Sequence, residues 1–205
     1  MKFQICAIII LLIFYGCYFG KMVIQKKKGI QTDQIGKGKR GIVKIIELTM
    51  KVATILVPIV EVVSICLNRT SLPAWARYIG IATAMLGDVI FVISVLTMRD
   101  SWRAGVSETD KTELVTDGIY QISRNPAFLG FDLVYIGVLL MFFNWILFVV
   151  SIFAMVMFHL QIVNLEEDFL TTAFGEEYLE YKRKVNRYLG RRLKMQGHTK
   201  RQKSC

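Results

Sequence analysis

Long apolar segments separated by short polar ones dominate this chain. Five segments are apolar enough to form transmembrane helices, at about residues 3–24, 42–67, 75–98, 127–143 and 145–163. A helix needs about 20 apolar residues to cross the hydrocarbon core of a bilayer, and most of these segments reach or approach that length. The last two meet at Asn144, which predicts a tight helical hairpin over about 127–163. The pattern therefore predicts an all-α integral membrane bundle of about five transmembrane helices.

A helix of a different kind is predicted after the hairpin. Within residues 175–189 the apolar positions recur at the spacing of one helix face, between charged residues. These positions are Tyr178, Tyr181, Val185 and Leu189. The spacing predicts a cytosolic C-terminal amphipathic helix. Residues 191–205 are basic and polar, which predicts a disordered tail.

Basic residues are clustered beside the apolar segments. The net charge is +10, although 54% of the residues are hydrophobic and the mean hydropathy is +0.44. Seven Lys or Arg lie between Lys21 and Arg40, and ten lie between Lys182 and Lys203. Such clusters next to transmembrane segments mark the cytoplasmic side. We therefore expect the N-terminus outside and the C-terminus in the cytoplasm, and no nucleic acid as partner.

The remaining composition argues against a metal centre and a cleaved leader. No two of the four cysteines have the CxxC spacing of a zinc site, so no metal is expected. In the first segment the basic residues follow the apolar run instead of preceding it. This order favours a membrane anchor over a signal peptide.

The sequence Arg124-Asn125-Pro126 immediately precedes the fourth segment. Proline suits the first turn of a helix, so Arg124 should lie at the membrane boundary beside a helix N-terminus. One interpretation is an anchor that binds lipid phosphate. The other is a clamp for an anionic ligand group, because a guanidinium and a helix N-terminus both bind anions.

Three acids, Glu166-Glu167-Asp168, follow the fifth segment. The C-terminal end of a helix normally favours cations, so acids there are unusual. They are either a solvated cap or include a carboxylate that binds a ligand. Gly130 and Gly137 share one face of the fourth segment, where they serve close helix packing or leave room for a flat cofactor.

Two further acids, Asp88 and Asp132, fall in or near apolar segments. Acids inside a membrane are costly and are functional candidates by default. Asp132 is also close enough in sequence to Arg124 to pair with it.

Four motifs occur in series between residues 101 and 189. They are SWRAGV (101–106), LVTDGIYQISRNPAFLG (114–130), NLEEDFL (164–170) and FGEEYLEYKRKVNRYL (174–189). In this order they resemble the membrane methyltransferase family that includes the isoprenylcysteine carboxyl methyltransferases and the phospholipid methyltransferases. Residues 1–100 would then form N-terminal transmembrane helices, and residues 101–190 the catalytic methyltransferase region.

The resemblance implies an S-adenosylmethionine-dependent methyltransferase acting in the membrane on a lipophilic or lipid-linked acceptor that enters from the lipid. By this resemblance the cofactor-binding residues are Tyr120, Arg124, Asn125, Pro126, Gly130, Glu166, Glu167, Tyr178 and Tyr181. The residues implied to be catalytic are Arg124, Glu167 and Arg187. Whether the methyl group goes to a carboxylate or an amine stays open.

Two positions depart from the family pattern. Asn125 replaces a histidine and Phe128 replaces a tyrosine. Asparagine donates and accepts hydrogen bonds but cannot carry a proton at neutral pH. Two alternatives therefore stand beside the methyltransferase: an NADPH-dependent membrane reductase of the sterol-reductase type, and a non-enzymatic membrane protein with a decayed cofactor pocket.

Overall fold

The structure, a computed structural model, describes residues 1–36, 39–103 and 113–191. Six α-helices form this described part: α1 (Lys2–Lys27), α2 (Gly41–Leu67), α3 (Ala74–Met98), α4 (Pro126–Met141), α5 (Trp145–Gln161) and α6 (Glu167–Lys184). Short 3-10 turns cover Arg99–Ser101 and Gly118–Gln121, and a π-helical turn, Ile162–Glu166, joins α5 to α6. Among these residues there is no β-strand, which confirms the predicted all-α fold.

Helices α1 to α5 form a multi-pass membrane bundle. Four continuous helical runs are long and apolar enough to cross a membrane: Lys2–Lys27, Gly41–Leu67, Ala74–Ser101 and Trp145–Lys184. Helix α4 is shorter, with 16 residues and a length of about 24 Å. All five segments begin and end within a few residues of the predicted bounds, because their limits are set by apolar length, by Pro126 and by Asn144. The Asn144 side chain caps α5 by accepting a hydrogen bond from the Leu147 amide.

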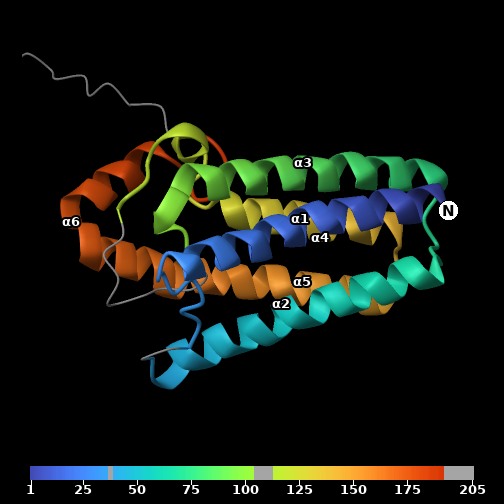
Figure 1. The fold of residues 1–205 in the computed structure, drawn as a ribbon, viewed down its shortest axis with the longest axis horizontal. Helices are drawn as coiled ribbons and strands as arrows, with labels where there is room; N and C mark the ends of the chain where they lie inside the picture. Colours follow the sequence, from blue (N-terminus) through green and yellow to red (C-terminus); the bar gives the residue numbers. More distant parts are fainter. Residues whose placement is uncertain (37–38, 104–112, 192–205) are drawn as a thin grey trace, which may run out of the picture.

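Helices α3 and α4 lie side by side through small residues (Figure 1). A Cβ atom added to Gly137 would lie 2.5 Å from the Cβ of Ala84, and one added to Gly87 would lie 2.8 Å from the Gly130 carbonyl oxygen. Such close backbone approach is typical of helix pairs in membranes. Gly130 and Gly137 thus serve helix packing.

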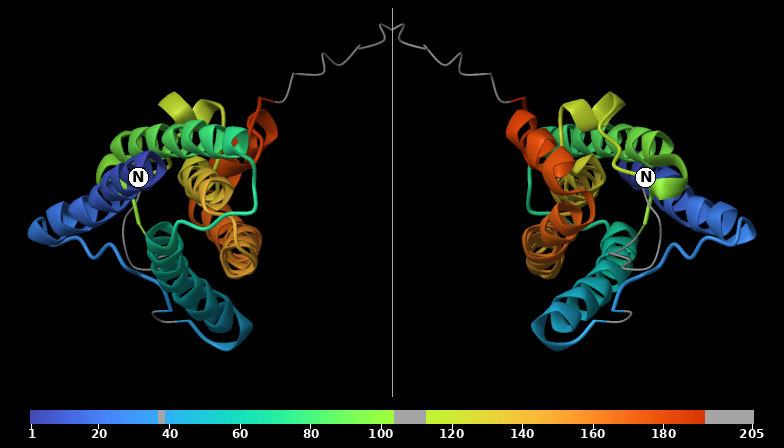
Figure 2. Two further views of the ribbon diagram at one scale, coloured as in Figure 1. Left: turned by 90° about the vertical axis from the view of Figure 1, so that its right-hand side faces the viewer. Right: turned by 90° about the vertical axis from the view of Figure 1, so that its left-hand side faces the viewer.

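Helix α2 is attached to the bundle mainly through α5. Met50, Ala53 and Val57 of α2 form a buried cluster with Ala154 and Phe158 of α5. By contrast, α1 and α2 diverge toward the end of the molecule that carries α6 (Figures 1 and 2). The outward faces of the helices are apolar, as expected for contact with lipid.

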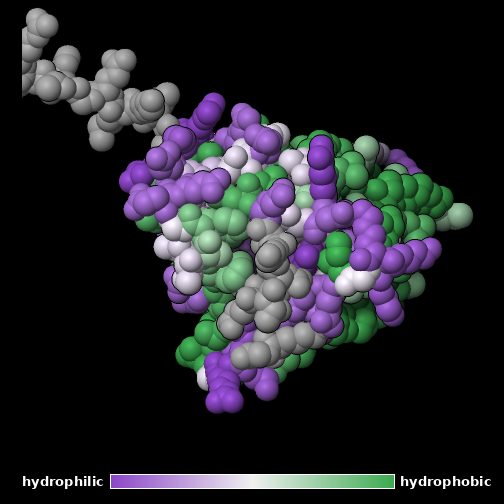
Figure 3. Space-filling view, turned by 60° about the vertical axis from the view of Figure 1, so that its left-hand side comes forward, coloured by the Kyte–Doolittle hydropathy of each residue, from purple (hydrophilic) through white to green (hydrophobic). Residues whose placement is uncertain are grey.

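The polar residues gather at the end with α6, while the flanks of the bundle are hydrophobic (Figure 3). Helix α6 is broken at Gly175, whose φ of 54° is left-handed and suits glycine. The predicted apolar stripe is confirmed for Tyr178, Tyr181 and Val185, which are buried.

The prediction that this helix continues to Leu189 is wrong. The helix ends at Lys184, Val185 is extended and pairs with Arg191, and Leu189 is exposed. The reason is a set of distant backbone hydrogen bonds, in which the Arg124 amide donates to the Asn186 carbonyl and the Gly190 amide donates to the Ile122 carbonyl. The residues after Lys184 thus pair with the loop that precedes α4. The predicted disordered tail lies, apart from Arg191, outside the described residues.

Candidate functional site

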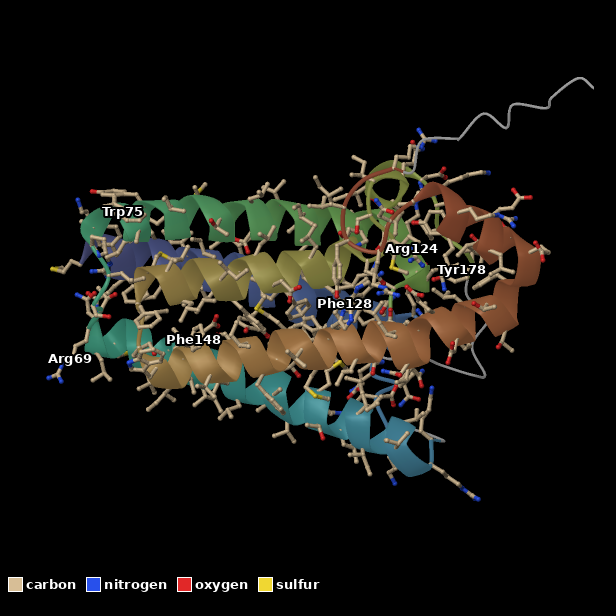
Figure 4. The ribbon with its side chains drawn as sticks, turned by 180° about the vertical axis from the view of Figure 1, so that it is seen from behind. Arg69, Trp75, Arg124, Phe128, Phe148 and Tyr178 are labelled. Atoms are coloured by element: carbon tan, nitrogen blue, oxygen red, sulfur yellow. The ribbon has the colours of Figure 1, made fainter. Side chains whose placement is uncertain are left out.

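The site lies at the polar end of the bundle, where the loop before α4 meets the junction of α5 and α6. Pro126 is at the start of α4, as predicted, so Arg124 lies just before the first turn. Arg124 and Tyr178 point toward each other at the end opposite Arg69 and Trp75 (Figure 4). The Arg124 guanidinium donates to the Tyr178 hydroxyl over 2.8 Å.

Glu167 is the centre of a cluster of charges. One of its carboxylate oxygens lies 3.0 Å from Arg124 Nη2 and 2.7 Å from Arg187 Nε, and the other lies 2.8 Å from Lys182 Nζ. The side chains of Glu167 and Arg124 are only 6% and 5% exposed. Arg124 therefore pairs with Glu167 and not with Asp132, the alternative that the sequence left open.

The two neighbouring acids differ in acidity. Both lie outside the membrane-spanning part of the 40-residue helical run Trp145–Lys184. That run is about 60 Å long, twice the thickness of the hydrocarbon core, so its polar C-terminal part extends beyond the membrane. Burial opposes ionisation of Glu167, but hydrogen bonds from Arg187 and Lys182 and the charge of Arg124 lower its pKa to about 2. Burial and the nearby charges of Glu47 and Glu167 raise the pKa of Glu166 to about 7.

A cavity opens between these elements, and we call it the polar cavity. It has a volume of about 150 Å³. Six of the predicted site residues line it: Tyr120, Arg124, Asn125, Pro126, Glu166 and Tyr181. Its lining also includes Arg103 and Glu113, which flank residues 104–112.

Four other predicted site residues are not among the lining residues of the polar cavity. Glu167 and Tyr178 bind the guanidinium of Arg124, Glu167 by an ion pair and Tyr178 by a hydrogen bond. Arg187 binds Glu167, and Gly130 packs against Phe91 and Gly87 of α3. Their assignment to catalysis or cofactor binding stays a prediction.

Several aromatic or aliphatic residues of the lining were missed from the sequence, among them Leu170, Phe174 and Trp102. Leu170 and Phe174 follow Glu166 at intervals of four residues, so all three lie on one side of the helix. This spacing was the signal that could have identified them. Trp102 lines the cavity as well, although only the motif that contains it could be identified from the sequence.

The Asn125 side chain has a structural role at this site. Its amide nitrogen donates to the Arg187 carbonyl over 3.1 Å. The contact helps to hold the segment after α6 against the loop before α4. Phe128, the other departure from the family pattern, packs against Phe158 of α5 with ring centroids 5.2 Å apart.

A second, larger cavity lies between α1 and α2, and we call it the apolar cavity. Its volume is about 600 Å³, and its floor is formed by aromatic residues of α3, α4 and α5. It shares the residues Trp102, Arg103, Ala127 and Phe128 with the polar cavity. Near its polar end Lys51 pairs with Asp33 over 2.6 Å. The two cavities are therefore adjacent across one wall.

Asp88 and Asp132 lie outside the linings of both cavities. Each is largely buried and has one carboxylate oxygen without a hydrogen-bond partner in the described part of the chain.

Comparison with known proteins places the chain in a family. Residues 75–177, half of the chain, match the phospholipid methyltransferase family. The chain belongs to this family. The match begins at α3 and ends within α6, so it contains Arg124, Glu166 and nearly all of the lining of the polar cavity, but only the α3, α4 and α5 side of the apolar cavity and not its α1 and α2 side. The resemblance drawn from the motifs is confirmed.

Similar curated proteins carry the name protein-S-isoprenylcysteine O-methyltransferase. A probable enzyme of this name from Oryza sativa subsp. indica is 31% identical over 114 residues, which are 55% of this chain and 60% of that protein. The Saccharomyces cerevisiae protein is 33% identical over 109 residues, 52% of this chain and 46% of its own. The Xenopus laevis protein is 32% identical over 113 residues, 54% of this chain and 39% of its own. The aligned region thus spans from about two fifths to three fifths of the length of these relatives. Membership of a methyltransferase family does not favour the reductase or the non-enzymatic alternative.

Proposed function

We propose that this protein is an S-adenosylmethionine-dependent methyltransferase that methylates the carboxylate of a lipid-linked acceptor at the cytoplasmic face of the membrane. The observation that supports it most is the adjacency of the two cavities. A polar cavity with an arginine and a carboxyl group shares a wall with an apolar cavity that lies between two transmembrane helices.

The donor groups of the polar cavity suit S-adenosylmethionine. Arg124 offers a cation to the carboxylate of the cofactor, and its buried Nε has no hydrogen-bond partner in the described part of the protein. Glu166 offers a carboxyl group to the ammonium group or the ribose hydroxyls, and Tyr120 and Tyr181 offer aromatic surface to the adenine. Bound S-adenosylmethionine supplies a methyl group on a positively charged sulfur.

Glu167 orients Arg124 in this proposal. The carboxylate accepts from Arg124 and Arg187, which come from sequence-distant segments, and so fixes the guanidinium beside the cavity. Tyr178 supports the same side chain from α6. The catalytic contribution of Glu167 and Arg187 is then to position Arg124.

The apolar cavity suits the hydrocarbon tail of the acceptor. The divergence of α1 and α2 gives the tail a lateral route from the lipid, and the shared wall brings its polar end next to the cofactor. Arg103 lines the polar end of this cavity beside the Lys51–Asp33 ion pair, so cations outnumber acids there, which favours an anionic acceptor group. A sulfonium loses charge as it donates its methyl group to a carboxylate, so a cavity shielded from water favours the reaction.

A carboxylate acceptor also agrees with Asn125. A carboxylate is already ionised at neutral pH, whereas an ammonium group must first lose a proton to a base. Asn125 cannot accept that proton, and the Glu166 carboxyl group of the same cavity is engaged with the cofactor in this proposal. The side chain instead holds the C-terminal segment through its bond to Arg187.

The topology expected from the basic clusters places this site in the cytoplasm. The α1 C-terminus, with Lys26 and Lys27, lies at the same end as α6 (Figure 1). We therefore propose that the N-terminus is outside and the C-terminus inside, with the cofactor drawn from the cytosol.

The test is methyl transfer by the detergent-purified protein from radiolabelled S-adenosylmethionine. The acceptors are N-acetyl-S-farnesylcysteine, the same compound with its carboxyl group amidated, and phosphatidylethanolamine. We expect label only in the free carboxylate compound. If only phosphatidylethanolamine is labelled, the acceptor is an amine and not a carboxylate. If S-adenosylmethionine does not bind saturably, the proposal is rejected.

Cofactor binding is tested by calorimetric titration of Glu166→Gln. Loss of a hydrogen bond to a charged group costs about 1.5–3 kcal/mol, so affinity should fall by roughly ten- to a hundredfold. Glu176→Gln is the matched control, because Glu176 is an exposed acid of α6 whose contact with Arg183 is 3.7 Å. Equal affinities in the two variants would remove Glu166 from the cofactor site.

A further inference from the structure

A further apolar cavity lies next to the apolar cavity, on the side toward the end of the bundle opposite α6. We call it the second apolar cavity. It has a volume of about 470 Å³ and lies between α1 and α2, with Ile8 and Cys66 at its far end. The two cavities share Tyr15, Phe19 and Pro58. Along α2 the apolar cavity extends over about 12 Å from Met50 to Pro58, and the second one over about 12 Å from Pro58 to Cys66, at 1.5 Å per residue.

Tyr15 crosses the gap where the two cavities meet. Its hydroxyl donates a long hydrogen bond, 3.5 Å, to Glu61 on α2. The ring is held on α1 by edge contacts with Phe14, at 5.2 Å between centroids, and by stacking against Phe19 at 6.3 Å. Since α1 and α2 otherwise touch little, this side chain is a barrier between the cavities.

Glu61 has no other evident reason to be in the membrane. The residue is fully buried, and its second carboxylate oxygen has no hydrogen-bond partner among the described residues. A carboxyl group at this depth is costly, and it is kept where it serves a function. Among the described residues, the bond from Tyr15 is the one hydrogen bond of the Glu61 side chain.

We propose that Tyr15, positioned by Glu61, limits the length of the hydrocarbon chain that the apolar cavity accepts. The inference rests on the proposed function, because it assigns the chain-length specificity of the same acceptor site. A tail that enters beside Phe128 meets the Tyr15 ring after about half the depth of the bundle. Only when Tyr15 moves or is removed does the tail reach the second cavity.

The test uses N-acetylcysteines that carry S-geranyl, S-farnesyl or S-geranylgeranyl chains. kcat/KM is measured for each chain with the wild type, Tyr15→Ala, Tyr15→Phe and Glu61→Gln. We expect Tyr15→Ala to raise the ratio of geranylgeranyl to geranyl kcat/KM at least tenfold. Tyr15→Phe should change it less, because the ring stays. Tyr78→Ala, at an exposed tyrosine of α3 outside both cavities, is the control and should leave the ratio unchanged.

A second readout does not depend on methyl transfer. The rise in melting temperature caused by each compound is measured without cofactor. Length-dependent stabilisation that shifts to the longest chain in Tyr15→Ala supports the inference even if no methyl transfer occurs, an outcome that would reject the proposed function alone. The same chain-length profile in wild type and Tyr15→Ala, in both readouts, would overturn the inference.

Discussion

Replacement of Glu167 by glutamine tests whether the charge cluster holds the site together. The variant keeps the size of the side chain and removes the charge, which leaves the buried Arg124 without its counter-ion. Removal of one partner from a buried ion pair costs about 3–5 kcal/mol. The side chains of Lys182 and Arg187 are 39% and 31% exposed, so water can solvate their charges when Glu167 loses its own. The full energetic cost therefore applies only to the Arg124 pair.

The expected loss of stability is therefore about 3 kcal/mol, the lower end of that range. For a chain of this size it corresponds to a fall in melting temperature of roughly 6–12 °C. The assay is thermal unfolding of the purified protein in detergent, followed by the accessibility of its cysteines. Glu180→Gln is the matched control: it removes an exposed α6 pair with Lys184, which is worth about 0.3–0.5 kcal/mol.

The pH dependence of the stability provides a second test of the role of Glu167. The pKa of Glu167 is about 2 in the folded protein, below its ordinary value of 4.5. Its contribution to stability is complete above pH 4.5 and is lost as the pH falls toward 2. Wild type should therefore lose more stability than Glu167→Gln over that interval. If Glu167→Gln is no less stable than Glu180→Gln at pH 7, the reasoning is refuted.

Two further predictions concern the cavity wall and the helix pair. Because the pKa of Glu166 is raised to about 7, its carboxyl group gains its negative charge between pH 6 and 8, and the affinity for S-adenosylmethionine should rise over this range in wild type but stay flatter in Glu166→Gln, as followed by calorimetric titration. Parallel slopes would show that the dependence comes from the ligand. Gly137→Ala should destabilise the protein by about 1–3 kcal/mol, because the new Cβ would lie 2.5 Å from Ala84, whereas Gly16→Ala meets nothing within 4 Å and should be neutral in the same thermal unfolding assay. Equal melting temperatures of these two variants would contradict the close packing of α3 on α4.

The helices could be predicted from the sequence because the signals for them are local. Apolar length set the limits of the membrane segments, Pro126 and Asn144 set the starts of α4 and α5, and the buried stripe through Tyr178 and Tyr181 followed from helical spacing. The motifs are local as well, so they indicate the family without any contact between them. The end of α6 was missed because its residues bond to the distant loop before α4.

The roles of the charged residues could be decided only by the tertiary structure. Glu166 and Glu167 are neighbours in sequence, yet one lines the polar cavity and the other binds Arg124, 43 positions earlier. Tyr15 and Glu61 are 46 residues apart, and nothing local in either segment indicates that they meet. By itself the sequence determined which segments enter the membrane, because transfer from water to lipid depends on each segment alone. Which acid faces the cavity and where the acceptor chain ends depend on contacts between helices, and these exist only once the bundle has assembled.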